Sequence, residues 1–383
     1  MLSTCSSLIA IVDDGYSQVV QFSHFSVKEF LTSDWLACSS ADISQYHIPL
    51  SPAHTILAQA CLGVLLRLDE HITEDNALEI PLAYYAARYW VDHAQCEDVS
   101  SHIQDVMECF FDAEKPHWAA WHCVYDIDNH SWPGITPYFV VRWAVPLCYA
   151  ALFGFHDLSE HLVVKNPEHV NAKGGQMATP LVAALHWGHF QVADVFHKHV
   201  SDINAHGTSG QTLLHQASTD ELLDIMQWLL DHGTDVNAIN ANTFAPLHLQ
   251  GVLICPEISR TLLEHNADIN ARDKFGKVPL HWAAMSEDTV DPKGMLKTMQ
   301  LLLNHGADPN VRDGDGCTPL YDSLWWEKEY YGQRRGTVKG SRLLLDHGAN
   351  IDAENDEGET PFQLALEMGY HEMAKFLSGR SAT

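Results

Sequence analysis

The sequence predicts a mainly α-helical solenoid of repeated helix pairs, and three observations support this fold class. A motif that reads Thr-Pro-Leu-His in its fullest form recurs about every 33 or 34 residues over the last two-thirds of the chain. An alanine pair follows the motif, and a leucine run then ends near a glycine or asparagine. A repeat of this length is one supersecondary unit that cannot bury its own apolar face, so neighbouring units must stack.

Seven copies align on the second residue of the motif, which serves as a register mark. These marks are Pro146, Pro180, Leu213, Pro246, Pro279, Pro319 and Pro361. Proline at the first helical position loses no needed N–H group, and a threonine before it can cap the helix. The capping threonines are Thr179, Thr212, Thr318 and Thr360.

The second helix of each copy should stop at a residue type that tolerates the left-handed conformation. The residues at this position are Gly233, Asn266, Gly306 and Gly348. Val200 holds the same position in the second copy, where we expect strain.

This pattern resembles the ankyrin repeat, whose Thr-Pro-Leu-His and Gly-Ala-Asp-Val-Asn-Ala motifs are matched from about residue 145 onward. The resemblance implies about seven antiparallel helix pairs with β-hairpin fingers. It also implies a concave face that binds other proteins, with contact positions at the fingertips and just after the alanine pair. We therefore expect a non-catalytic interaction scaffold without a cofactor.

The candidate partner-binding residues of the middle copies lie at these positions. By register they are Phe244, Lys274, Phe275, Lys277 and Met285. Exposed aromatic side chains beside lysines indicate an anchor for a partner segment that carries carboxylates. The alternative is that each finger aromatic packs on the neighbouring finger.

Two copies contain insertions, around residues 287–293 and 326–340, and insertions in solenoids form loops that are often used for binding. The second insertion is rich in the residue types that anchor interfaces. Its candidates are Trp325, Trp326, Tyr330, Tyr331, Arg334 and Arg335. The alternative is a longer inner helix that buries one tryptophan.

Composition limits the classes of partner. The chain has 383 residues and a formal net charge of −28, which disfavours nucleic acid and anionic membranes as partners. The nine cysteines are irregularly spaced, as in reduced intracellular proteins. We find neither a signal segment nor a run of about 20 apolar residues, so a cytoplasmic monomer is expected.

The first 128 residues lack the repeat and form the first of three predicted parts, before a connector over 129–144 and the repeats over 145–383. Two apolar runs around Asp13-Asp14-Gly15-Tyr16 predict a β-hairpin. A capping box at Ser26 predicts a short helix, and further helices are expected over 54–68, 78–95, 99–111 and 118–125. This bundle should cover the apolar end of the first repeat, at Val140, Val141 and Trp143, while residues 375–383 give a polar end.

The strings Val20 to Leu31 and Leu82 to Trp90 are similar to the winged-helix-like element and helical spacer of fungal NACHT-type signalling proteins that end in ankyrin repeats. The resemblance covers about residues 8–125 and implies that the repeats are a sensor end. The chain contains no Gly-x-x-x-x-Gly-Lys-Ser/Thr motif, so we expect a fragment or a stand-alone relic without NTP hydrolysis. The alternative function is a fragment of a nucleotide switch that keeps nucleotide contact near His24.

Most of the 25 histidines are explained by the repeat rather than by a metal. One set occupies the last position of the Thr-Pro-Leu-His motif, and another lies in the last turn of the second helix, where a histidine can bind orphan carbonyls. The irregular set His186, His189, His197 and His199 is weak as a zinc site because no cysteine pair is near. His93 and Cys96 are a weak catalytic pair because no third orienting group can be named.

Overall fold

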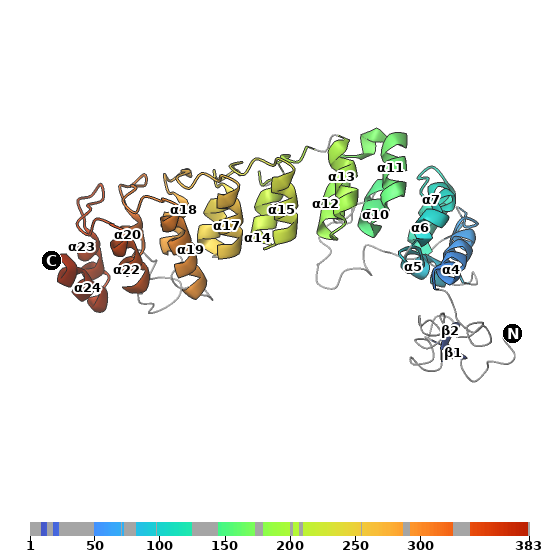
Figure 1. Ribbon diagram of the computed structural model, residues 1–383, viewed down its shortest axis with the longest axis horizontal. Helices are drawn as coiled ribbons and strands as arrows, with labels where there is room; N and C mark the ends of the chain where they lie inside the picture. The colour runs from blue at the N-terminus through green and yellow to red at the C-terminus, as the bar shows by residue number, and fades with distance from the viewer. Residues whose placement is uncertain are drawn as a thin grey trace, which may run out of the picture. The chain divides into compact units, whose positions relative to one another are not determined.

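The computed structural model describes residues 9–13, 18–22, 50–69, 71–72, 82–96, 98–124, 145–172, 179–199, 202–206, 210–253, 255–285, 292–324 and 338–381. These residues belong to two compact units, 1–201 and 202–383, which are described separately. The predicted domain boundaries follow the repeat motif and stay a prediction. Figure 1 shows the elements of both units.

The first unit contains the N-terminal hairpin, the helical bundle and the first two helix pairs. The expected hairpin is an antiparallel pair, β1 Ile9–Asp13 and β2 Gln18–Phe22, with Ile11 opposite Val20. The helices of the bundle are α4 Leu50–Leu65, α5 Ala83–Ala94, α6 Val99–His102, α7 Gln104–Phe110 and α8 Pro116–Val124. The repeats of this unit are α10 Pro146–Phe153 with α11 His156–Lys165, and α12 Pro180–His186 with α13 Phe190–Lys198, with a short 3-10 turn at Pro167–His169.

An aromatic core joins the bundle to the first repeat. Trp90 of α5 is fully buried, and its ring centroid lies 6.0 Å from that of Phe153 and 5.7 Å from that of Phe155. Trp121 of α8 similarly lies 5.8 Å from Tyr149 of α10, and its indole N–H donates to the Ala87 carbonyl at 3.2 Å. The bundle thus covers aromatic side chains of the first repeat, as expected, while the expected contact residues Val140, Val141 and Trp143 lie outside the described residues.

The second unit contains five helix pairs. They are α14 Leu213–Thr219 with α15 Leu223–Asp231, α16 Pro246–Leu253 with α17 Pro256–Glu264, α18 Pro279–Met285 with α19 Pro292–Asn304, α20 Pro319–Asp322 with α22 Val338–Asp346, and α23 Pro361–Glu367 with α24 His371–Ser381. The described residues of the two units contain seven helix pairs, and the first helix of each pair begins at one of the seven register marks. Buried leucines such as Leu229, Leu262, Leu302 and Leu344 form the core of the stack.

The helix ends follow the predicted chemistry. Thr179, Thr318 and Thr360 each accept a hydrogen bond from the backbone N–H three residues on. The second helices end at positive φ, at Gly233, Asn266, Gly306 and Gly348, while Val200 lies outside the described residues. The last-turn histidines bind the carbonyl four residues earlier through Nδ1, as expected. The pairs are His232 with Trp228, His265 with Thr261, His305 with Leu301 and His347 with Leu343.

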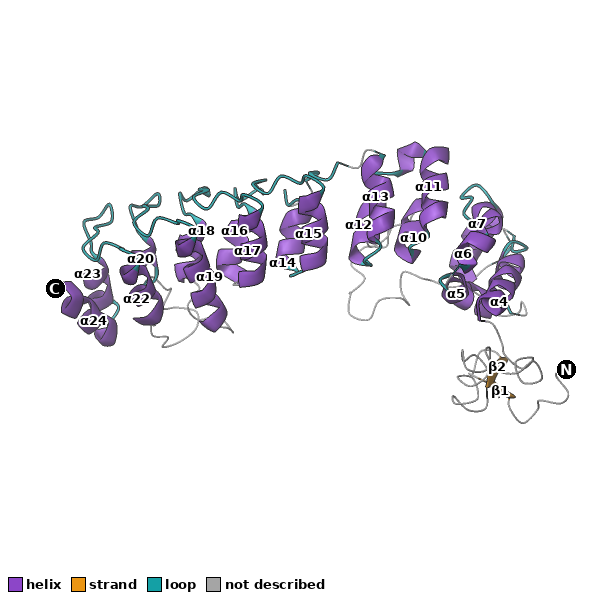
Figure 2. Cartoon of the chain, in the orientation of Figure 1, coloured by secondary structure: helices purple, strands orange, loops and turns teal. Residues whose placement is uncertain are grey.

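The loops that precede the first helices project on one side of the helix pairs in the second unit (Figure 2). Within the described part of that unit they contain no β-strand, so the expectation of β-hairpin fingers is wrong for these loops. The fingers are instead closed turns, and we name them by residues 240–245, 273–278, 313–318 and 355–360. Among the helices of the described residues, none has the length and apolar content needed to cross a bilayer.

Buried histidines connect each repeat to the next. The Nδ1 atom of His281 accepts from the Val278 backbone N–H at 3.1 Å, so its Nε2 carries the proton and donates to the Cys317 carbonyl at 3.2 Å. His215 and His248 make the same two kinds of bond. Burial lowers the pKa of all three histidines, and that of His281 falls to about 4. A protonated ring would lose its Nδ1 acceptor, so these bonds require neutral histidine.

The lowered pKa of His281 predicts a loss of stability in acid. The unfolded state binds a proton below the ordinary pKa of about 6.5, whereas the folded state resists protonation down to about pH 4. The free energy of unfolding should therefore decrease as pH falls through this window, by at most about 3 kcal/mol. The pKa of Asp322 is raised to about 6, so Asp322 increases the free energy of unfolding as pH falls through the same window. The contribution of His281 must therefore be measured as the difference between the wild type and a His281 variant.

His281→Gln provides that comparison because Gln363 occupies the same position in the last repeat, where its side chain accepts from the Thr360 N–H at 2.7 Å. The variant should keep the cap, lose one inter-repeat hydrogen bond and become less stable by about 1 kcal/mol at pH 7. Urea unfolding should show this deficit shrinking or reversing by pH 5. His305→Gln, at an exposed position, is the control, and an unchanged deficit at both pH values would refute the prediction.

Candidate partner-binding fingers

Each finger is closed by the side chain of its first residue. An Asn or Asp oxygen accepts hydrogen bonds from the backbone N–H groups two and four residues on. In finger 273–278, Asp273 Oδ1 binds the N–H groups of Phe275 and Lys277, both at 2.8 Å. Asn240, Asp313 and Asn355 make the equivalent pairs of bonds. Because two N–H groups are capped by a side chain, each tip has a defined conformation without a strand ladder.

Backbone contacts tie neighbouring fingers together. The Gly314 N–H donates to the Phe275 carbonyl at 2.8 Å, and the Asp356 N–H donates to the Asp315 carbonyl at 3.0 Å. Gly276 permits the first contact because it adopts φ +75° and a Cβ there would lie 2.7 Å from the Gly314 nitrogen. The fingertips are therefore spaced by main-chain hydrogen bonds rather than by side chains alone.

Two arginines reinforce this spacing. Arg272 Nη1 donates to the carbonyls of Gly276 in its own finger and Arg312 in the next, at 2.9 and 2.8 Å. Arg312 then reaches Asp356 of the following finger, with Nη2 3.0 Å from Oδ1. Fingers 273–278, 313–318 and 355–360 are thus held as one preorganised row.

The predicted anchor is present at the tip of finger 273–278. Phe275 is 50% exposed, and the Lys274 ammonium lies 5.1 Å from its ring centroid. Lys274 Nζ also donates to Asn242 Oδ1 of the preceding finger at 2.9 Å. An exposed aromatic ring is thus held beside a positioned cation, which can interact with both apolar and carboxylate groups.

Phe244 follows the alternative interpretation for finger aromatics. Its half-buried ring is stacked on His248, with centroids 5.7 Å apart, and lies edge-on to Trp282 at 5.1 Å. Phe244 therefore packs against the helices behind its finger. Met285, at the end of α18, is also half-buried.

Lys277 does not point toward solvent, in contrast to its expected place in the anchor. Its side chain is 14% exposed, and Nζ lies 2.6 Å from Asp313 Oδ2 and also contacts Asp322 Oδ2. Burial alone would lower the pKa of Lys277, but the two carboxylates outweigh burial and raise it. Lys277 thus joins finger 273–278 to finger 313–318 and to α20.

The pKa values of the two carboxyl groups are shifted in opposite directions. Burial would raise the pKa of Asp313, but its bonds to Lys277 hold the pKa below the ordinary value. Burial dominates at Asp322 and raises its pKa to about 6, despite the same lysine. One ammonium thus fully compensates only one of the two buried acids.

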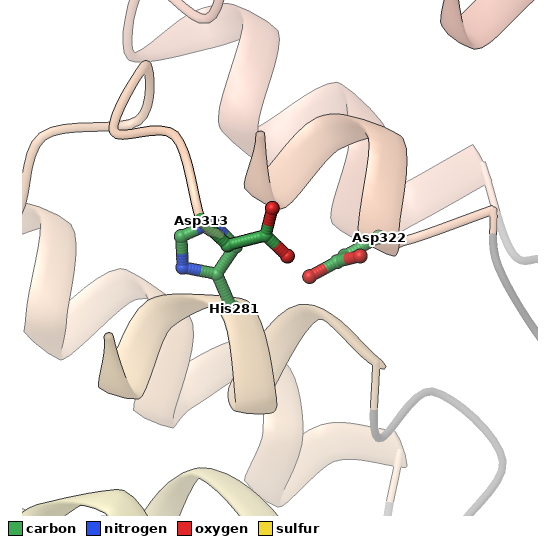
Figure 3. Close-up of side chains that lie close together, drawn as sticks. All are labelled: His281, Asp313 and Asp322. Carbon is green, nitrogen blue, oxygen red and sulfur yellow. The ribbon is translucent and has the colours of Figure 1, made fainter. Parts of the chain in front are cut away.

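His281, Asp313 and Asp322 have the donor types of a metal site, and their ligand atoms lie within 4.8 Å of one another. Figure 3 shows the two carboxyl groups pointing toward each other beside the His281 ring. Two contacts argue against a metal here. Lys277 Nζ already bonds to both carboxylates, and both ring nitrogens of His281 are used in backbone hydrogen bonds. The cluster is best described as a buried ion-pair network.

The family model for ankyrin repeats matches three stretches of the chain, residues 147–240, 252–331 and 293–382. Together they cover more than half of its length. The chain belongs to the ankyrin-repeat family. It is also similar to "Azaphilone pigments biosynthesis cluster protein L" of Monascus ruber, at 27% identity over 222 residues. This match covers 53% of the chain but only 46% of the relative, so the chain covers less than half of that protein's length.

The ankyrin match begins at residue 147, so the NACHT-type resemblance of residues 8–125 gains no support from it and stays a prediction. His24 lies outside the described residues. So do the candidates of the second insertion, Trp325, Trp326, Tyr330, Tyr331, Arg334 and Arg335.

The other candidate sites have ordinary contacts. His93 binds His54 at 2.9 Å through Nδ1 and the Tyr85 hydroxyl at 3.0 Å through Nε2, while the Cys96 thiol donates to the Asp92 carbonyl at 3.5 Å. His189 Nε2 lies 3.1 Å from the Leu152 carbonyl. These contacts support structural roles for both histidines.

The ion-pair network of this ankyrin domain was missed from the sequence, although one signal was present. Asp322 stands where five of the other six aligned copies have an apolar or aromatic residue and the third copy has Gln216; the five are Tyr149, Ala183, Leu249, Trp282 and Leu364. An acidic residue at an apolar core position requires a nearby partner. Sequence separation did not identify the partner, because Lys277 lies 45 residues before Asp322.

Proposed function

We propose that this ankyrin-repeat protein is a non-catalytic scaffold that binds a protein partner through its finger row, with Phe275 and Lys274 at the centre of contact. Family membership supports protein binding in general. The observation that carries the narrower proposal is the half-exposed Phe275 ring beside Lys274, on a finger held to both neighbours by hydrogen bonds.

Preorganisation is the physical reason for choosing this row. A flexible loop loses conformational entropy when it binds, whereas these tips are already ordered by side-chain caps and inter-finger bonds. Aromatic and cationic side chains on such a support are typical hot spots. A partner segment with an apolar side chain next to a carboxylate would complement both groups.

The double variant Lys274→Ala/Phe275→Ala tests the site. Truncation of a hot-spot residue reduces the binding free energy by more than about 1 kcal/mol. The amount of each specific partner captured at limiting bait should therefore fall at least about fivefold. The measurement is quantitative mass spectrometry of captured proteins, followed by calorimetric titration of the strongest partner. Helical circular dichroism should be unchanged.

Leu223→Ala/Arg260→Ala is the matched control because it also removes an exposed apolar and an exposed cationic side chain. These two residues lie on α15 and α17, and we call the second helix of each pair the outer helix. It should leave capture intact. Equal binding by the wild type and the finger variant would remove the finger row as the binding site.

The finer hypothesis, in which these repeats are the sensor end of a NACHT-type signalling protein in the cytoplasm, rests on the resemblance of residues 8–125. The name of the Monascus ruber relative refers to a biosynthesis cluster and specifies no partner. The scaffold proposal does not depend on either.

A further inference from the structure

The last three outer helices form a basic surface on an otherwise acidic chain. Helices α19, α22 and α24 carry six Lys or Arg residues and only two Asp or Glu residues. The six cations are Lys293, Lys297, Lys339, Arg342, Lys375 and Arg380, and all are exposed. By contrast, the equivalent helices α15 and α17 together carry one cation and four acids.

The repeat register brings these cations into line. Lys297 and Lys339 each lie five residues before the equivalent buried leucines Leu302 and Leu344. Arg342 and Lys375 each lie two residues before Leu344 and Leu377. Because α22 packs against both α19 and α24, the cations of successive helices are neighbours on one face.

Internal contacts leave three lysines of this surface available, namely Lys297, Lys339 and Lys375. Arg380 pairs with Asp346 at 2.8 Å, and Arg342 and Arg380 lie 5.4 and 5.5 Å from the Phe376 ring centroid, which orders both guanidinium groups. Within the described part of the chain, Lys297, Lys339 and Lys375 have no carboxylate at ion-pair distance.

Exposed acidic groups lie at the tips of the last two fingers, whereas finger 273–278 carries Lys274 and Lys277. Asp315, Asp356 and Glu357 are exposed at the tips, and among the described residues after 279 only Arg312 supplies a cation there. In the last two repeats, the exposed acids of the fingertips are thus separate from the cations of α22 and α24.

We propose that α19, α22 and α24 form a second docking surface, which binds an acidic segment of a partner protein in an extended conformation. Packed helices lie about 8–10 Å apart, and an extended chain advances about 3.3 Å per residue. A carboxylate at about every third residue therefore matches the helix spacing. At physiological salt the screening length is about 8 Å, so local complementarity outweighs the distant negative charge of the fingers.

A fluorescein-labelled peptide of about twelve residues with Glu at every third position is the probe, with Gln at the same positions as its neutral control. Fluorescence anisotropy should show binding of the Glu peptide that weakens with added salt. The variant Lys297→Glu/Lys339→Glu/Lys375→Glu should reduce its affinity at least tenfold. If that variant unfolds, Lys→Gln at the same three positions replaces it, with a loss of at least threefold expected.

Lys115→Glu/Lys165→Glu/Lys198→Glu is the matched control, because it makes the same change in net charge at exposed lysines of the first unit. It should change affinity less than twofold. Equal losses in both triple variants, or equal binding of the Glu and Gln peptides, would overturn the proposal. Lys274→Ala/Phe275→Ala should keep peptide binding, which separates this surface from the finger row.

Two further measurements identify which kind of molecule binds this basic surface. Tighter binding of a single-stranded oligonucleotide of equal charge, lost in the first triple variant, would assign the surface to nucleic acid and overturn a protein partner. Light scattering that shows self-association of the wild type, removed by the same variant, would assign it to the acidic fingers of a second copy. A monomer that prefers the Glu peptide supports the proposal.

Discussion

Replacing Lys277 by methionine is expected to destabilise the second unit by about 3–5 kcal/mol at pH 7, because it leaves two buried acids without their cation. Asp313 and Asp322 are nearly inaccessible, with side chains 1% and 4% exposed, so solvent cannot take the place of the ammonium. Urea unfolding followed by circular dichroism measures the loss. Lys274→Met is the control, since Lys274 is exposed on the same finger and should change stability by less than about 0.5 kcal/mol.

The pH dependence of this loss should show whether unpaired charge causes it. Without Lys277, the pKa of each acid should rise in the folded state because the charged form loses its partner. A carboxyl group whose pKa is raised in the folded state lowers the free energy of unfolding as pH increases. The variant should therefore recover part of its lost stability when pH falls from 7 to 5. A deficit that is independent of pH would mean that lost packing, rather than unpaired charge, causes it.

A second variant separates the two contributions. Lys277→Met/Asp313→Asn/Asp322→Asn removes all three charges, and replacing a buried ion network with neutral groups is often close to neutral in stability. This triple variant should recover most of the loss of the single variant. If it is less stable than Lys277→Met, the carboxylates must have roles in folding beyond pairing with the lysine.

The repeat period explains why much of the fold could be predicted. Proline at the start of a helix, and glycine or asparagine at its end, act through local backbone geometry. The starts of the seven first helices and the carbonyl contacts of the last-turn histidines depend on such local rules, and both were confirmed. The coverage of the first repeat by the bundle followed from the need to bury an apolar end.

The direction of finger side chains was harder to predict because it depends on contacts between repeats. Register places Phe244, Lys277 and Phe275 in fingers, but it does not say which side chain turns inward. Phe244 packs inward because His248 and Trp282 offer ring partners, and Lys277 turns inward because Asp322 is buried nearby. Phe275 alone of these three stays largely exposed.

Trp90→Ala is expected to destabilise the first unit by about 3–5 kcal/mol, since it removes a fully buried indole and leaves a cavity. Its ring contacts Phe110 and Trp121 of the bundle, with centroids 5.5 and 6.0 Å away, and also Phe153 and Phe155 of the first repeat. The cavity would thus open between the bundle and the repeat that it covers. Trp187→Ala, at a residue 44% exposed, should cost much less and serves as the control.

Hydrogen exchange measured by mass spectrometry can locate this effect. If the bundle caps the first repeat, amides of α10 should exchange faster in Trp90→Ala together with those of α5 and α8, because loss of the shared core uncouples both elements. Amides of the second unit should be unchanged. Faster exchange confined to the bundle, with α10 as protected as in the wild type, would show that the first repeat does not need its aromatic cover. The first repeat would then be held by its packing against α12, and the bundle would be a separate folding unit rather than a cap.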